Sequence, residues 1–105
     1  MNPEHWGPYA WRFLHCVTLT YPDQPTLREK KEYKAFFRSL CYVLPCKLCR
    51  KHYEGHLEKD PLTDKVLSDR TSLVKWLIRI HNRVNRQEHK PVLTYEQALT
   101  IIKKC

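Results

Sequence analysis

The stretch TLREKKEYKAFFRSLCYVLPCKLC, residues 26–49, predicts one complete helix and the beginning of the next. Thr26 and Glu29 form a T-x-x-E capping box, in which each side chain bonds a free backbone N–H of the first turn. The apolar residues that follow recur with a 3.6-residue period, which is typical of a helix with one buried face. They are Tyr33, Phe36, Phe37, Leu40, Val43 and Leu44. Pro45 interrupts this helix because it lacks a backbone N–H.

The pair Cys46 and Cys49 lies where the next helix is expected to start, a position suited to redox chemistry. The helix dipole and the free amide groups of a first turn stabilise a thiolate, and the C-x-x-C spacing lets the two sulfurs close a small ring. Lys47, Arg50 and Lys51 add positive charge, which we expect to favour the thiolate further. The pair is therefore the first candidate for a catalytic site.

Further helices are predicted on both sides of this stretch. One runs from about Pro8 to Leu19, and the helix that starts at the cysteine pair ends before Asp60-Pro61, since a residue before proline avoids helical geometry. Another runs from about Asp69 to Arg86. A short one follows Thr94, which forms a capping box with Gln97. No segment alternates as a strand does, so we predict an all-α fold: a four-helix bundle with a short fifth helix.

Size and composition narrow the class of protein. A chain of 105 residues with 42% hydrophobic residues supports one core, so we expect a single domain over residues 1–105. No stretch approaches the roughly 20 uncharged apolar residues of a membrane span, and the N-terminus lacks the basic-then-apolar order of a signal peptide. We therefore expect a soluble protein that is not secreted. The two glycines exclude a glycine-rich phosphate loop, so side chains and helix faces must hold any nucleotide.

The net charge of +8 favours a phosphate-bearing ligand, a nucleic acid or an acidic partner. Basic residues occur in every segment, so a solvated basic surface explains the same composition. Cytosolic proteins seldom keep structural disulfides, and five cysteines therefore suggest that some thiols are reactive. The three cysteines outside the pair stand alone, and each by itself is predicted to be an inert thiol. They are Cys16, Cys41 and Cys105.

Zinc is the alternative use of the cysteine pair, because Cys46, Cys49, His52 and His56 spell C-x2-C-x2-H-x3-H. On one continuous helix, however, residues 46 and 56 are about 15 Å apart at a rise of about 1.5 Å per residue, whereas tetrahedral zinc ligands converge within a few ångströms. A zinc or nucleic-acid binding helical module stays as the alternative, as does a helical interaction protein without redox activity. Thioredoxin-like exchange needs a sheet, for which the chain shows no βαβ pattern.

Three segments taken together are more specific than any one of them. They are WGPYAWRFLH at residues 6–15, then YPD at residues 21–23 followed by PCKLC at residues 45–49, then HNRVN at residues 81–85 with Lys90-Pro91. In order and spacing, residues 6–91 resemble the Erv/ALR family of FAD-linked sulfhydryl oxidases. The resemblance implies a helical bundle that holds FAD and forms disulfides in protein substrates, passing electrons through the C-x-x-C pair and the flavin to O2 to give H2O2.

The resemblance also implies roles for individual residues. Cys49 is expected next to the flavin, and Cys46 is expected to be the outer cysteine that exchanges with substrate thiols. The positions that match the flavin pocket are Gly7, Trp11, His15 and Tyr21, with His52 as a further member. Those that match the adenine and phosphate side are His81, Asn82, Val84, Asn85 and Lys90. His81 and Asn85 are i, i+4 neighbours, so both project from one edge of their helix, and Arg83, Arg86 and Lys90 are placed to neutralise a pyrophosphate.

The chain departs from the family pattern in two places. Many cellular members have a disulfide between the fourth and fifth helices, but Ile78 and Tyr95 occupy those positions here, so that staple is missing. The shuttle pair on a flexible tail is also absent, so we expect either that substrates attack Cys46 directly or that Cys105 joins a partner or a second subunit. Compact members of this kind resemble those of large cytoplasmic DNA viruses.

The viral resemblance implies a place of action and a set of partners. The place is the host cytoplasm or the virion, with the mitochondrial intermembrane space as the cellular alternative. The expected partners are protein thiols or a thioredoxin-like carrier, O2 as electron acceptor and a second copy of the chain in a homodimer. Neither a membrane nor a nucleic acid is expected as a partner.

Overall fold

The computed structural model describes residues 1–105, and it is all-helical. The helices are α1 (Pro3–Leu19), α2 (Leu27–Val43), α3 (Lys47–Lys59), α4 (Arg70–Gln87) and α5 (Tyr95–Ile102), with a 3-10 turn η1 (Val66–Ser68) before α4. The predicted bundle of four helices with a short fifth is therefore confirmed. No helix combines the length and the apolar composition that a membrane crossing requires.

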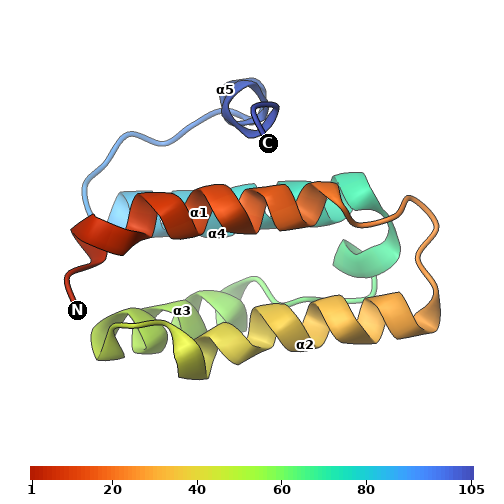
Figure 1. The fold of residues 1–105 in the computed structure, drawn as a ribbon, viewed down its shortest axis with the longest axis horizontal. Helices are drawn as coiled ribbons and strands as arrows, with labels where there is room; N and C mark the ends of the chain where they lie inside the picture. The colour runs from red at the N-terminus through yellow and green to blue at the C-terminus, as the bar shows by residue number, and fades with distance from the viewer.

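The helices form two layers and a cover. Figure 1 shows α1 and α4 side by side in one layer and α2 and α3 in the other, with α5 seen end-on across the outer side of the first layer. The main core lies between the two layers. Its largest fully buried side chains are Trp76, Tyr21 and Phe37. A smaller core beneath α5 consists of Val74, Ile78, Ala98 and Ile102.

Local capping rules predict most helix boundaries. The capping boxes of Thr26 with Glu29 and of Thr94 with Gln97 are both present, and the Asp69 carboxylate accepts a hydrogen bond in the first turn of α4. The predicted start of α1 is wrong. The helix begins at Pro3 rather than Pro8, because the Asn2 side chain accepts a hydrogen bond from the Glu4 N–H. Pro8 lies inside the helix, where it removes a single N–H from the backbone ladder.

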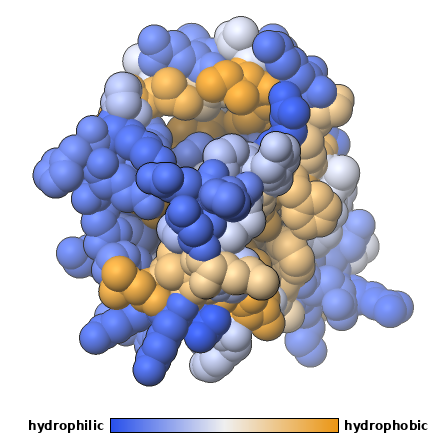
Figure 2. All heavy atoms as spheres, turned by 60° about the vertical axis from the view of Figure 1, so that its left-hand side comes forward, coloured by the Kyte–Doolittle hydropathy of each residue, from blue (hydrophilic) through white to orange (hydrophobic).

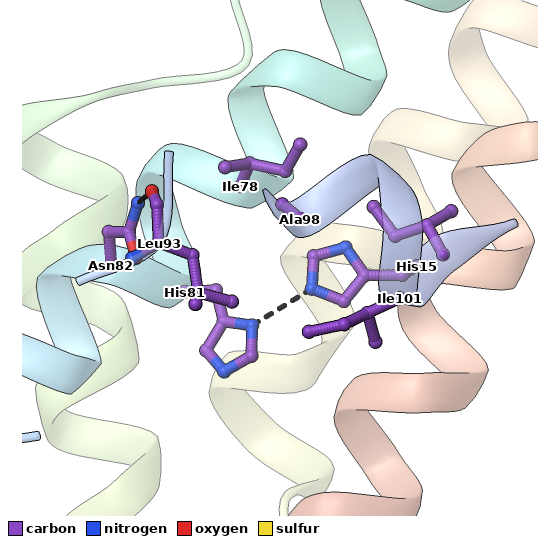
Figure 3. Close-up of a pocket in the computed structure, with 8 residues that line it drawn as sticks. His15, Ile78, His81, Asn82, Leu93, Ala98 and Ile101 are labelled. Carbon is purple, nitrogen blue, oxygen red and sulfur yellow. Dashed lines mark hydrogen bonds between the residues drawn. The ribbon is translucent and has the colours of Figure 1, made fainter. Parts of the chain in front are cut away.

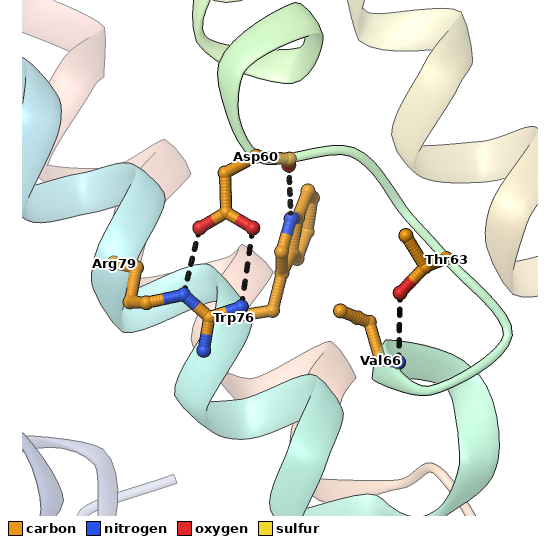
Figure 4. Close-up of polar contacts among 5 residues, drawn as sticks. All are labelled: Asp60, Thr63, Val66, Trp76 and Arg79. Atoms are coloured by element: carbon orange, nitrogen blue, oxygen red, sulfur yellow. Dashed lines mark hydrogen bonds and ion pairs between the residues drawn. The ribbon is translucent and has the colours of Figure 1, made fainter.

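The segment between α3 and α4 is fixed by polar contacts of its backbone and side chains (Figure 4). The Trp76 indole N–H donates to the Asp60 carbonyl at 2.8 Å, and the Arg79 guanidinium binds the Asp60 carboxylate through two nitrogens. The Thr63 hydroxyl accepts from the Val66 N–H at the start of η1. These bonds satisfy backbone groups that the end of α3 leaves free, and they set the direction in which α4 begins.

Cys16 and Cys105 form a disulfide that joins α1 to the end of the chain. The expectation that each is a lone thiol is therefore wrong, and Cys105 is not free to join a second subunit. The reason is topological: α5 packs back across α1 and α4, which places the last residue beside the final turn of α1. The disulfide spans a separation of 89 residues, so no local pattern indicates it. This bond fixes the C-terminal end of α5 to α1.

Candidate active site

The cysteine pair lies at the junction of α2 and α3, where the chain stops being helical for three residues. Cys46 has extended backbone geometry and is the N-cap of α3, and its Sγ accepts a hydrogen bond from the Cys49 N–H at 3.2 Å. Both thiols are free and half-buried. The pair is thus at the positive end of the α3 dipole, as the sequence predicts.

The two thiols have opposite acidities. Hydrogen bonds from the Cys49 side chain and backbone lower the pKa of Cys46, whereas burial and the hydrogen bond with Cys46 raise the pKa of Cys49 to about 11. In the reduced pair, Cys46 is therefore the more acidic of the two thiols, and Cys49 keeps its proton at neutral pH. Hydrogen bonding dominates the lowering of the Cys46 pKa, and the only charge that adds to it is that of the N-terminal amine, so the expected contribution of Lys47, Arg50 and Lys51 is not found. One of those, Arg50, instead donates to the Leu44 carbonyl.

A second cluster joins α1 to α4 through three aromatic rings. His15 Nε2 and His81 Nδ1 are 2.9 Å apart and share a hydrogen bond, as Figure 3 shows. The Trp11 indole stacks on the His81 imidazole, with ring centroids 3.9 Å apart and planes within 5°. The sequence predicts all three as cofactor ligands, and the structure brings them together although 66 residues separate the two histidines.

Both histidines are held in the neutral form. Burial lowers the pKa of His15 to about 4 and, together with the charges of His15 and Lys90, lowers the pKa of His81 to about 3. At neutral pH one imidazole therefore donates to the other, and the pair carries no charge. The remaining nitrogen of His15, Nδ1, is buried and has no hydrogen-bond partner.

Another buried nitrogen, Trp6 Nε1 in the first turn of α1, also lacks a partner. Unpaired buried polar atoms are rare in folded proteins, and His15 Nδ1, beside the stacked rings, is the one that a ligand bound at the cluster could pair with. Residue-by-residue matching did not select Trp6, although it lies in the segment that carries the resemblance.

These residues fit FAD in their chemistry. Stacked rings offer a face to a planar ring system, and unpaired nitrogens can bond its polar edge. The cavity between these histidines and α5 has a volume of about 40 Å3, which is too small for a flavin. Because Trp11 and His81 are already in contact, a planar ligand must lie against the outer face of the stack or separate the two rings.

Most of the other predicted cofactor ligands already form hydrogen bonds or ion pairs within the protein. Asn82 holds the segment before α5 in place, because its amide donates to the Leu93 carbonyl and accepts from the Leu93 N–H. Asn85 donates a hydrogen bond to the Asn82 side chain. Val84 is half-buried, and the Lys90 ammonium pairs with Glu88 at 3.0 Å. Asn82 and Asn85 thus have structural bonds of their own and lie beside the histidine pair.

Two predicted ligands lie apart from the ring cluster. Tyr21 is fully buried in the main core, and its hydroxyl donates to the Leu67 carbonyl at 2.7 Å. That setting is typical of a structural tyrosine, and the structure does not bring it to the histidine pair. His52 is half-buried on α3, three residues beyond Cys49.

The zinc alternative is not favoured by the arrangement of ligands. No three His, Cys, Asp or Glu side chains are grouped so that they could hold a metal ion. His56, the last of the four candidate ligands, is instead within hydrogen-bond distance of the Gln87 side chain on α4, at 3.1 Å.

Comparison with known proteins identifies relatives across nearly the whole chain. The family model described as the Erv1 / Alr family matches residues 8–103. A probable FAD-linked sulfhydryl oxidase of Acanthamoeba polyphaga mimivirus is 54% identical over 104 residues, which are 99% of this chain and 73% of that protein. A FAD-linked sulfhydryl oxidase of African swine fever virus is 33% identical over 93 residues, 89% of this chain and 76% of that protein.

A solved structure shares the fold as well. The FAD binding domain of Erv1 from Saccharomyces cerevisiae superposes with a TM-score of 0.81 at 32% identity, covering 90% of this chain and 87% of that one. The similarity therefore extends over the helices that hold both the cysteine pair and the ring cluster.

Proposed function

This chain belongs to the Erv1 / Alr family, and from that premise we propose that it is a FAD-linked sulfhydryl oxidase whose Cys46–Cys49 pair oxidises protein thiols. The observation that carries the proposal is the cysteine pair at the start of α3, in which one thiol is acidic and its neighbour keeps its proton. A helix start with this division of acidity is suited to thiol–disulfide exchange.

The exchange steps use the two cysteines in different roles. A substrate thiolate attacks Cys46 Sγ in the oxidised pair, so that a mixed disulfide forms and Cys49 leaves as a thiolate and takes up a proton. A second substrate thiolate then attacks the substrate sulfur of the mixed disulfide, which releases the substrate disulfide and the Cys46 thiolate. The substrate loses two electrons and two protons, and the cysteine pair gains the two electrons.

Bound FAD would supply a two-electron acceptor for the reduced pair and the chemistry that reduces O2 to H2O2. The proton on Cys49 must leave before that sulfur can give up electrons, because its pKa is about 11. The hydrogen-bonded Cys46 thiolate is the nearby base that can accept it. We assign Cys49 to the cofactor side, since burial raises its pKa, and Cys46 to the substrate side.

The residues that would hold FAD are those of the ring cluster and their neighbours. Trp11 and His81 supply stacking surface, and His15 Nδ1 supplies a polar atom that lacks a partner. Basic side chains near the end of α4 would balance the charge of the pyrophosphate. They are Arg83, Arg86 and Lys90. Gly7 leaves space along α1 for a bound ring.

The partner in the assembly is a second copy of this chain. Tyr9 and Phe13 lie one turn apart on α1 with exposed fractions of 74% and 61%, and such a pair of aromatic side chains is typical of an interface. Sedimentation analysis of Phe13→Glu would test the dimer, with monomers expected. The viral relatives support action on protein thiols in the host cytoplasm or the virion.

Dithiothreitol oxidation, followed as oxygen consumption, tests the proposed function. Cys46→Ser and Cys49→Ser should each abolish turnover while FAD stays bound, because each leaves the ring cluster intact. Cys41→Ser is the matched control, since it removes a free, half-buried thiol on α2 outside the pair, and it should keep the wild-type rate. A Cys49→Ser variant with the wild-type rate would refute the assignment.

A further inference from the structure

The surroundings of Cys46 contain apolar side chains that the fold leaves without partners. Tyr42 and Val43 end α2, Leu48 lies in the first turn of α3, and their exposed fractions are 83%, 63% and 60%. None of them belongs to either hydrophobic core. Three exposed apolar residues within four positions of one reactive sulfur indicate a contact surface.

The charge next to the pair in the sequence is of one sign, whereas in space the Glu88 carboxylate adds to the effect of burial in raising the pKa of Cys49. Between residues 41 and 53 the chain has three basic residues and no acidic one. Arg50 is held by the Leu44 carbonyl, but Lys47 and Lys51 are exposed and take part in no ion pair. These two lysines are i, i+4 neighbours, so they lie on one face of α3.

In Figure 2 the end of the molecule that holds the α2–α3 junction faces the reader. Low in that view, apolar atoms form a patch surrounded by hydrophilic ones. An apolar centre with a polar rim is the usual composition of a protein-binding surface. Tyr42 also borders an open groove between α2 and α3, whose lining includes Cys41 and Leu57. The lining of this groove mixes apolar residues with charged ones, among them Glu54 and Glu58.

The state of the other cysteines shows how substrates reach the pair. Cys105 is bonded to Cys16, so neither is a free thiol that could relay electrons to Cys46. The remaining free thiol, Cys41, lies on α2, and burial raises its pKa, which makes it a poor nucleophile. Within residues 1–105, a substrate thiol must therefore attack Cys46 itself, and the surface around Cys46 touches the substrate.

We infer that Tyr42, Val43 and Leu48, together with Lys47 and Lys51, form a docking surface for the substrate segment that carries the attacking thiol. This segment is an extended stretch of a protein, with apolar and acidic side chains next to its cysteine. The inference rests on the proposed function and names its substrate class. The chemistry is unchanged: the docked thiolate attacks Cys46 Sγ, and the substrate leaves as a disulfide.

Two synthetic dithiol peptides of equal length test the docking surface, with dithiothreitol as the substrate that is too small to use it. One peptide has Leu and Glu next to its cysteines, and the other has Ser and Lys. The wild-type protein should oxidise the Leu and Glu peptide with kcat/KM about tenfold higher or more, and added salt should reduce the difference. The change is expected in KM.

Variants show whether these residues are the cause. Tyr42→Ser with Val43→Ser, and separately Lys51→Glu, should reduce the preference while leaving dithiothreitol oxidation and bound flavin unchanged. The controls are Leu27→Ser, an 80% exposed residue at the far end of α2, and Lys65→Glu, which lies beside η1. Both controls should keep the wild-type preference.

Three results would overturn the inference. The first is equal kcat/KM for the two peptides. The second is a Tyr42→Ser, Val43→Ser variant that loses dithiothreitol and peptide oxidation in the same proportion, since that is a structural effect. The third is a change from dimer to monomer in that variant, which would make the surface an interface between copies. A wild-type protein that oxidises no dithiol, dithiothreitol included, would refute the proposed function itself.

Discussion

Removing the Cys16–Cys105 disulfide should cost this protein more stability than any other single change on its surface. The bond closes a loop across a separation of 89 residues, and the chain-entropy model assigns a loop of that length about 4.6 kcal/mol. Cys105 is exposed, so Cys105→Ser creates no cavity, and its effect comes from the greater freedom of the unfolded chain. We expect a loss of about 3 to 4.6 kcal/mol in the free energy of unfolding.

Urea unfolding followed by circular dichroism measures this loss, with the same excess of FAD for every variant so that cofactor binding adds equally. The loss corresponds to a fall in Tm of at least about 12 °C for a domain of this size. The m value should rise, because the unfolded chain without the bond is less compact. Cys16→Ser combined with Cys105→Ser should match the single variant to within about 0.5 kcal/mol, because both remove the same bond.

Cys41→Ser is the control, since it removes a half-buried thiol that forms no disulfide. It should change the free energy of unfolding by less than about 1 kcal/mol. A Cys105→Ser variant as stable as the wild-type protein, or a Cys41→Ser variant that loses as much, would refute the entropy argument.

Three further predictions concern the ring cluster and the ends of α4 and α5. Because burial lowers the pKa of His15 and His81 to about 4 and 3, both should stabilise the fold above pH 6.5 and progressively lose this contribution as the pH falls. His15 alone contributes about 3 kcal/mol, and a urea midpoint that stays constant from pH 7 to pH 4.5 would contradict this. Asn82→Ala should cost about 1–3 kcal/mol and speed hydrogen exchange in α5, because it leaves the Leu93 N–H and carbonyl unpaired; unchanged exchange in α5 would contradict it. Asp69→Ala should cost about 1 kcal/mol in thermal unfolding by removing the cap of α4, while Asp69→Asn keeps most of it; equal losses would show that the cap is not the cause.

The helices could be predicted from the sequence because the signals that form them are local. Thr26 with Glu29 and Thr94 with Gln97 are separated by three residues each, and both capping boxes are present. The predicted start of α1 at Pro8 is wrong because Asn2 caps the helix and Pro3 occupies its first turn, so the helix begins earlier. The 3-10 turn at residues 66–68 was missed because three residues give no periodic pattern.

Residues of the candidate site that are distant in sequence could be predicted only where several motifs occur together in the order and spacing of the family. Trp11, His15 and His81 meet although they are far apart in sequence, and only the combination of segments indicated that. Tyr21 shows the limit of this matching, because its burial in the core depends on the packing of α2 and η1 around it. The bond between Cys16 and Cys105 depends on the path of α5 and leaves no trace in the spacing of the cysteines.

The absorption spectrum of the purified protein during one redox cycle tests the central claim, that Cys46 and Cys49 pass electrons from thiols to a bound flavin. A yellow protein with a flavin spectrum should bleach when dithiothreitol is added without air, and the colour should return with O2 as H2O2 appears. The Cys49→Ser variant should be equally yellow and should not bleach. A colourless wild-type protein, or a flavin that dithiothreitol bleaches at the same rate in Cys49→Ser, would contradict the claim.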